Sequence, residues 1–287
     1  MDQLCHEFQH GQLHEPTNQI RLLEISAVNR GDAEPTVHCQ LSTWRVGQQP
    51  EYVAVSYTWG YSSDQQSISA NTRPLRVYRN CYDVLIQIWD SGNRSYLWID
   101  AICINQADDE EKSHQVAMMG FIYKTAWQVH VCLGPHSDAS DELFGCMNHH
   151  SSCIGEILQG CVVDIEARRS QDSLRKLLRK YTTFEYLSHL SLQDINAAVK
   201  ALRQLSERSY FRRLWMIQEF LLSQRAVLFC GTSSIDLRQL RCFYDDLTKY
   251  YRETKVQRQT AGKMHEIDMW FPTRNLVALL QNHNESA

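Results

Sequence analysis

The stretch Leu97-Trp-Ile-Asp-Ala-Ile-Cys-Ile-Asn-Gln106 decides the expected fold, because it passes from an apolar run into polar side chains. Its apolar start is typical of a strand that is buried on both faces. Asp100, Asn105 and Gln106 then follow at or beyond the C-terminal end of this strand, where ligands bind in open α/β sheets. Acidic residues at 108–111 come next and precede a helical pattern, which suits the positive end of a helix dipole. The stretch therefore predicts either a ligand-binding loop or a core strand and a capped helix without chemistry.

Strands and helices alternate on both sides of this stretch. The patterns predict a hairpin at 67–78 and strands at 20–26, 37–44, 52–57, 126–133 and 226–230. They also predict helices at 80–89, 192–206, 236–251 and 274–281, the first of them capped by Asn80. The regular alternation from about residue 52 to residue 135 indicates a mostly parallel sheet flanked by helices, with extra strands before it. We therefore expect an α/β fold.

One segment, residues 137–191, interrupts the alternation. It is mostly helical in pattern, so we expect a helical insertion in a single domain of residues 1–287, with the core at about 20–250. Two cysteines flank two histidines at 146–153, but this spacing matches no common zinc module, and we expect no metal site. The last helical pattern stops abruptly, which suggests a truncated C-terminal end.

Charge and cysteine usage narrow the class of protein. The formal net charge of −4 over 287 residues lacks the basic excess of a nucleic-acid binder. No run is long and apolar enough to span a bilayer, and the N-terminus does not have the pattern of a signal peptide. Ten cysteines are scattered without a Cys-x-x-Cys pair, which favours buried, reduced thiols. We therefore expect a cytoplasmic protein without a nucleic-acid partner or a membrane span.

The sequence contains no dinucleotide fingerprint, phosphate-binding loop, nucleophile elbow or His-Glu-x-x-His motif. The remaining candidates for a binding or catalytic site are three clusters of polar residues. Each cluster adjoins an apolar segment: Ser56-Tyr-Thr-Trp59-Gly60, Asp100 with Asn105-Gln106, and Trp215 with Gln218-Glu219. The first two lie at the C-terminal ends of expected strands. Because the C-terminal ends of parallel strands share one edge of the sheet, we expect these two clusters to converge.

Each cluster also has a purely structural interpretation. Thr58-Trp59-Gly60 can form a ligand platform, but the same residues suit a tight turn with a packed tryptophan. Trp215, Gln218 and Glu219 are three or four residues apart and would share one helix face. A carboxylate beside a tryptophan is a plausible catalytic group, whereas most glutamates on helices are simply exposed. Both interpretations of Glu219 remain open at this point.

The sequence blocks around these clusters resemble the heterokaryon-incompatibility (HET) domain, a fungal self/non-self recognition family. Tyr52-Val-Ala-Val-Ser-Tyr-Thr-Trp-Gly60 resembles its first block. The stretch Leu97–Gln106, continuing to Leu133-Gly134, resembles the second, and Arg213-Leu-Trp-Met-Ile-Gln-Glu219, continuing to Cys230-Gly231, resembles the third. Met216 departs from the pattern, because the family usually has threonine there.

The resemblance implies more than the residues alone. HET domains are similar to TIR domains, which have a flavodoxin-like sheet and in many cases hydrolyse NAD through one essential glutamate. Arg213-x-Trp215-x-x-x-Glu219 is similar to the pattern around that glutamate, so the resemblance implies that Glu219 is catalytic. NAD or a related nucleotide would then be the substrate, with no separate cofactor. The implied substrate-binding residues are Ser56, Trp59, Gly60, Asp100, Asn105, Gln106, Trp215 and Gln218.

Three functions remain open from the sequence. The first is an NAD-hydrolysing cell-death effector that self-associates and could respond to a partner signalling protein. The second is a non-enzymatic protein–protein interaction module, in which Asp100 and Glu219 only hold loops in place. The third is unrelated small-molecule chemistry on the same fold. Whether the chain is an enzyme is therefore an open question at this stage.

Overall fold

The computed structural model describes residues 7–31, 34–137, 139–151, 191–213, 219 and 222–253. The chain divides into two compact units, one made of residues 1–135 with 213–232 and the other of 136–212 with 233–287. The prediction of a single domain stays a prediction. Most of the expected insertion and the expected helix at 274–281 lie outside the described residues.

The first unit is built on a mixed sheet. The strands follow one another across it in this order: β5 (Arg73–Tyr78), β4 (Gln65–Ala70), β2 (Thr36–Arg45), β1 (Gln19–Asn29), β6 (Tyr96–Trp98), β3 (Tyr52–Tyr57), β7 (Gln128–Cys132) and β8 (Ala226–Cys230). From β6 to β8 neighbouring strands are parallel, whereas β1 is antiparallel to both β2 and β6. The α/β class is therefore confirmed, and the N-terminal strands make the sheet mixed.

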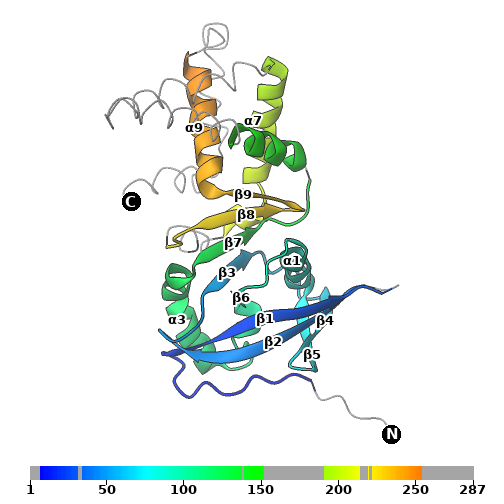
Figure 1. Cartoon of the computed structure of the whole chain (residues 1–287), viewed down its shortest axis with the longest axis vertical. Coiled ribbons are helices and arrows are strands. Elements are labelled where there is room, and N and C mark those ends of the chain that lie inside the picture. The colour runs from blue at the N-terminus through cyan, green and yellow to red at the C-terminus, as the bar shows by residue number, and fades with distance from the viewer. Residues whose placement is uncertain are drawn as a thin grey trace, which may run out of the picture. The chain divides into compact units, whose positions relative to one another are not determined.

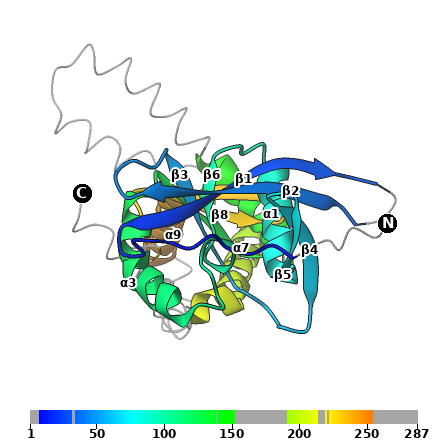
Figure 2. The same cartoon turned by 90° about the horizontal axis from the view of Figure 1, so that it is seen from below.

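Two helices cover the parallel strands. α1 (Arg79–Asp90) and α3 (Asp109–Thr125) lie on opposite sides of them in both views (Figure 1, Figure 2). Every residue of β3 and β7 is buried, as expected for strands that are covered on both faces. Asp108 caps α3 by accepting hydrogen bonds from the backbone N–H groups of Glu110 and Glu111, as the acidic start of this helix predicts.

The order of the parallel strands creates a switch point beside β3. The chain passes from β3 to β6 on one side of it and then to β7 on its other side. In such sheets, ligands bind outside the carboxyl ends of the strands where the order reverses. Ala54 pairs with Trp98, so Ser56 and Asp100 each follow two residues later along neighbouring parallel strands. The topology thus brings the first two polar clusters to one edge of the sheet.

Two local predictions are wrong. Asn80 does not cap α1, because the N-cap is Tyr78 and no side chain bonds the helix start there. The Asn80 amide instead donates a 2.8 Å hydrogen bond to the carbonyl oxygen of Thr58. The expected loop after β6 begins with one helical turn, α2 (Asp100–Cys103), which buries Ile102 and Cys103.

The second unit is mainly helical in its described part. It contains a helix at 140–151, α7 (Leu192–Ser206), the 3-10 turn η1 (Ser209–Arg212), the short strand β9 (Ser233–Asp236) and α9 (Leu237–Glu253). α7 begins at the predicted residue with a capping box between Ser191 and Asp194. His150 contacts Asp246 at 2.9 Å and joins the first of these helices to α9. Within the described ranges, no helix has the length and apolar character needed to cross a bilayer.

Candidate active site

Glu219 lies buried beside the end of β3. Only 1% of the residue is exposed, which excludes the interpretation of Glu219 as a solvated helical acid. The hydroxyl of Ser56, which is equally buried, donates a hydrogen bond to Oε2 of Glu219. A buried carboxylate needs such partners, because transfer from water into the protein otherwise disfavours the charge. Ser56 and Glu219 are 163 positions apart in the chain, so the fold itself assembles this pair.

Arg213 supplies the positive charge of this cluster. Its Nη2 lies 3.2 Å from Oε1 of Glu219, and its Nη1 lies 3.4 Å from Oε2. The same Nη1 is 3.5 Å from the hydroxyl oxygen of Ser56. The sequence places Arg213 at the start of the third block but gives it no role, because an arginine that follows another arginine usually lies on the surface. Here its side chain is 22% exposed, so one cation links the buried carboxylate to solvent.

Asp100 is the second carboxylate of the site. The indole N–H of Trp59 donates to both of its oxygens, at 3.1 and 3.0 Å, and the backbone N–H of Ala101 donates at 2.7 Å. Burial raises the pKa of Asp100 to about 6, although these hydrogen bonds and the charge of Arg213 lower it. The negative charge of Glu219 raises it further. The two carboxylates and Arg213 therefore act on one another electrostatically.

The loop that carries Trp59 is held in a fixed shape. Asn80 bonds the carbonyl oxygen of Thr58, and the ring of Trp59 lies 5.9 Å from that of Tyr78, centroid to centroid. Gly60 has a φ of +87°, and a Cβ at this position would lie 3.0 Å from the amide nitrogen of Asn80. The backbone conformation therefore favours glycine here, and a methyl group would also have to displace the side-chain amide of Asn80. The stretch is a packed turn, and its tryptophan contacts Asp100.

Not every predicted site residue joins this cluster. The side-chain oxygen of Asn105 accepts from the backbone N–H of Ala107, and the Gln106 amide donates to the carbonyl oxygen of Asp100 at 3.0 Å. Both amides thus bond within their own loop. Trp215 and Gln218 lie outside the described residues. The binding roles assigned to all these residues stay predictions.

The cluster made of Ser56, Trp59, Asp100, Arg213 and Glu219 can stabilise charge of either sign. Its carboxylates can oppose a developing positive charge, and the guanidinium of Arg213 can bind an anionic group. Within the described ranges, no group of three or more His, Cys, Asp and Glu side chains is placed to hold a metal ion.

Comparison with known proteins shows that the residues of this cluster lie in the part of the chain that matches a known family. A sequence model described as "Heterokaryon incompatibility protein (HET)" matches residues 52–219, which include all five members of the cluster. "Heterokaryon incompatibility protein 6, OR allele" of Neurospora crassa is 29% identical over 252 residues. That match covers 81% of this chain and 36% of the relative, so the chain spans about a third of the length of that protein. No solved structure matches the chain.

Proposed function

Since the chain belongs to the heterokaryon incompatibility (HET) family, we propose that it acts in fungal self/non-self recognition by hydrolysing the nicotinamide–ribose bond of NAD. The name of the Neurospora crassa relative supports the biological setting. In this proposal the protein is a cytoplasmic cell-death effector that self-associates.

The buried Glu219 beside Ser56 is the observation that carries the enzymatic proposal. It lies at the carboxyl end of β3, next to the switch point of the parallel strands. Numbered along the chain, the parallel strands follow the order second, first, third, fourth. This is the order at the start of a flavodoxin-like sheet, and it supports the TIR-like interpretation of the fold.

The proposed chemistry needs one carboxylate and one water molecule. Breaking the bond between nicotinamide and ribose develops positive charge on the ribose, which the carboxylate of Glu219 stabilises electrostatically. Nicotinamide leaves with the bonding electron pair as a neutral ring, so no strong general acid is needed. Water then adds to the anomeric carbon and loses a proton, giving ADP-ribose. Arg213 is suited to the diphosphate of the substrate, because it is the partly exposed cation of the cluster.

Release of nicotinamide from NAD by the purified protein tests this proposal. Glu219→Gln keeps an acceptor for Ser56 but removes the charge, so turnover is expected to fall by about 100- to 1000-fold. Glu110→Gln is the matched control, since Glu110 is an exposed acid of α3 and its loss should leave turnover unchanged. Full turnover by folded Glu219→Gln would overturn the assignment.

The second candidate is a non-enzymatic interaction module. It is favoured by the internal satisfaction of both carboxylates, because Glu219 is bonded by Ser56 and Arg213, and Asp100 by Trp59. A polar network of this kind can serve only to fix loop positions. In that case the folded wild-type protein would release no nicotinamide, and Glu219→Gln would change stability or self-association instead.

A further inference from the structure

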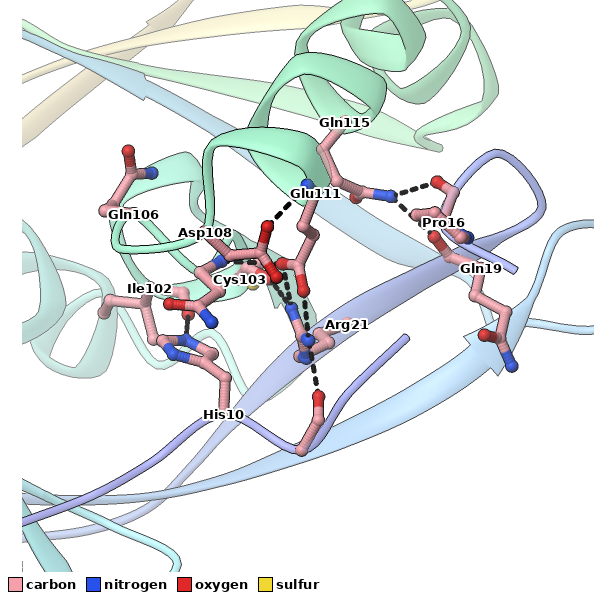
Figure 3. Close-up of polar contacts among 12 residues, drawn as sticks. His10, Pro16, Gln19, Arg21, Ile102, Cys103, Gln106, Asp108, Glu111 and Gln115 are labelled. Atoms are coloured by element: carbon pink, nitrogen blue, oxygen red, sulfur yellow. Dashed lines mark hydrogen bonds and ion pairs between the residues drawn. The ribbon is translucent and has the colours of Figure 1, made fainter. Parts of the chain in front are cut away.

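A buried ion pair lies directly behind the loop that carries Asp100. Arg21 of β1 and Glu111 of α3 are only 2% and 5% exposed. They face each other with two parallel hydrogen bonds, Nη1 to Oε1 at 2.6 Å and Nη2 to Oε2 at 2.8 Å (Figure 3). This two-point geometry fixes the orientation of both groups. The pair belongs to none of the three polar clusters that the sequence suggests.

Both members of the pair also bond the main chain of the site loop. Nη1 of Arg21 donates to the carbonyl oxygen of Cys103 at 3.0 Å. Oε1 of Glu111 accepts from the backbone N–H of Asn105 at 2.7 Å. Burial opposes ionisation of Glu111, but the hydrogen bonds from Arg21 and Asn105 outweigh it and hold the pKa below its ordinary value. The loop therefore rests on a charged, doubly bonded support.

The N-terminal segment, residues 8–18, is attached to the same support. Nη2 of Arg21 donates to the carbonyl oxygen of Gly11 at 2.6 Å, and Nε2 of His10 lies 2.7 Å from that of Ile102 (Figure 3). Gln115 of α3 donates to the carbonyl oxygens of Pro16 and Gln19. Figure 2 shows this segment running from beside β5 to α3 without forming a helix or a strand.

A buried ion pair such as Arg21–Glu111 contributes little net stability, so its main effect is on the position of the groups that it bonds. The cost of taking both charges out of water offsets most of their attraction, so apolar side chains of similar size often stabilise a fold as well. Apolar side chains cannot, however, bond the carbonyl oxygen of Cys103 or the N–H of Asn105. Arg21 and Glu111 thus differ from an apolar pair in the hydrogen bonds that they make to the main chain of the loop.

We propose that Arg21 and Glu111 are positioning residues of the candidate site, which hold residues 100–106 so that Asp100 meets Trp59 beside Glu219. The effect on catalysis rests on the proposed function, but the effect on the loop does not. The N-terminal segment takes part through Gly11, so the geometry of the site depends on residues far from it in sequence.

Hydrogen exchange of the full chain tests this proposal without reference to activity. In the double variant Arg21→Met/Glu111→Leu, peptides spanning residues 99–106 should exchange about tenfold faster, because bonds to charged groups are lost. Peptides of β7 should keep their protection. The matched control is Arg203→Met/Glu207→Leu, which removes an exposed Arg–Glu pair of 3.0 Å at the end of α7 and should leave the loop unchanged. Unchanged exchange of residues 99–106 in the folded double variant would overturn the proposal.

A conservative variant covers the case in which the double variant does not fold. Arg21→Lys keeps the charge opposite Glu111 but loses the two-pronged geometry, so exchange of residues 99–106 should rise by a smaller factor. Protection equal to that of the wild type would contradict the proposal. Nicotinamide release is measured in parallel. If the wild-type protein releases none, the proposed function fails, while the exchange of the loop still decides whether the pair positions it.

Discussion

Replacing Asp100 by asparagine is expected to stabilise the folded protein at neutral pH while impairing the site. Burial raises the pKa of Asp100 from 3.8 to about 6, so the folded state binds this proton more tightly than the unfolded state does. The free energy of unfolding therefore falls as pH rises from 3.8 to 6. Each unit of this pKa shift corresponds to 1.36 kcal/mol, so the charged carboxylate of Asp100 lowers the free energy of unfolding by about 3 kcal/mol at pH 7.

Asparagine removes this cost but not the whole arrangement. The carbonyl oxygen of asparagine can still accept a hydrogen bond from Trp59 or Ala101. Its amide nitrogen is a donor, however, and cannot accept a second bond, so about one hydrogen bond is lost. The net gain at pH 7 is about 1 to 3 kcal/mol. At pH 4 the carboxyl of Asp100 is already protonated in the folded protein, and the electrostatic part of the gain falls to less than about 1 kcal/mol.

Urea unfolding at pH 7 and pH 4, followed by circular dichroism, measures this difference. Groups distant from Asp100 titrate alike in both proteins, so subtracting the two comparisons leaves the contribution of Asp100 and of the charges that it interacts with. Lower stability of Asp100→Asn than of the wild type at pH 7, or the same difference at both pH values, would refute a raised pKa of Asp100 in the folded protein. Stabilisation together with lost turnover would mark Asp100 as a residue kept for function rather than for stability.

Three further predictions concern two substitutions in the turn beside Asp100 and the titration of a buried histidine in β7. Trp59→Phe removes a hydrogen bond that lowers the pKa of Asp100, so the fall of stability with pH should move above pH 6; an unchanged midpoint would contradict this. Gly60→Ala should lower the free energy of unfolding by about 1–2 kcal/mol because of the left-handed backbone, and further because its methyl group would lie 3.0 Å from Asn80. The control Gly47→Ala has a similar backbone (φ +84°) but open space around it, so only the backbone cost should apply. Equal urea midpoints for the two variants would refute the effect of the close contact. His130, whose pKa burial lowers to about 4, should show an NMR titration midpoint below pH 5, and a midpoint near 6.5 would disprove its burial.

The sequence predicted strands correctly where the residues are both apolar and buried in the structure. The run at 52–57 is apolar and rich in β-branched and aromatic residues, and β3 has these bounds in the structure. The run at 226–230 gives β8 in the same way. β9 was missed because its four residues form no apolar run or alternating pattern of useful length. Periodicity thus locates strands only when burial dominates their composition.

Polar contacts between distant segments could not be predicted. Glu111 stands among acids that favour a helix start, and only the fold places Arg21 against it. Gln115 lies on the buried face of α3, where an apolar residue would be expected, because it bonds the carbonyl oxygens of Pro16 in the N-terminal segment and of Gln19 at the start of β1. Asn80 was assigned to a helix cap because capping is a local rule, whereas its partner, Thr58, is 22 positions away. These pairings depend on tertiary structure.

The candidate site was predictable only in outline. Ser56 and Asp100 were expected to converge, since both lie at the C-terminal ends of parallel strands. The choice of Glu219 came from a resemblance, and its burial became visible only when the chain was folded. Arg213 had no assigned role, because nothing in its sequence position distinguishes a paired cation from a solvated one.

The most direct measurement of the central claim is the yield of both products from NAD across a series of protein concentrations. Hydrolysis at Glu219 should give equal amounts of nicotinamide and ADP-ribose, with turnover per chain that rises with concentration because the protein self-associates. Intact NAD at every concentration, in a protein shown to be folded, would contradict hydrolysis at the cluster around Glu219.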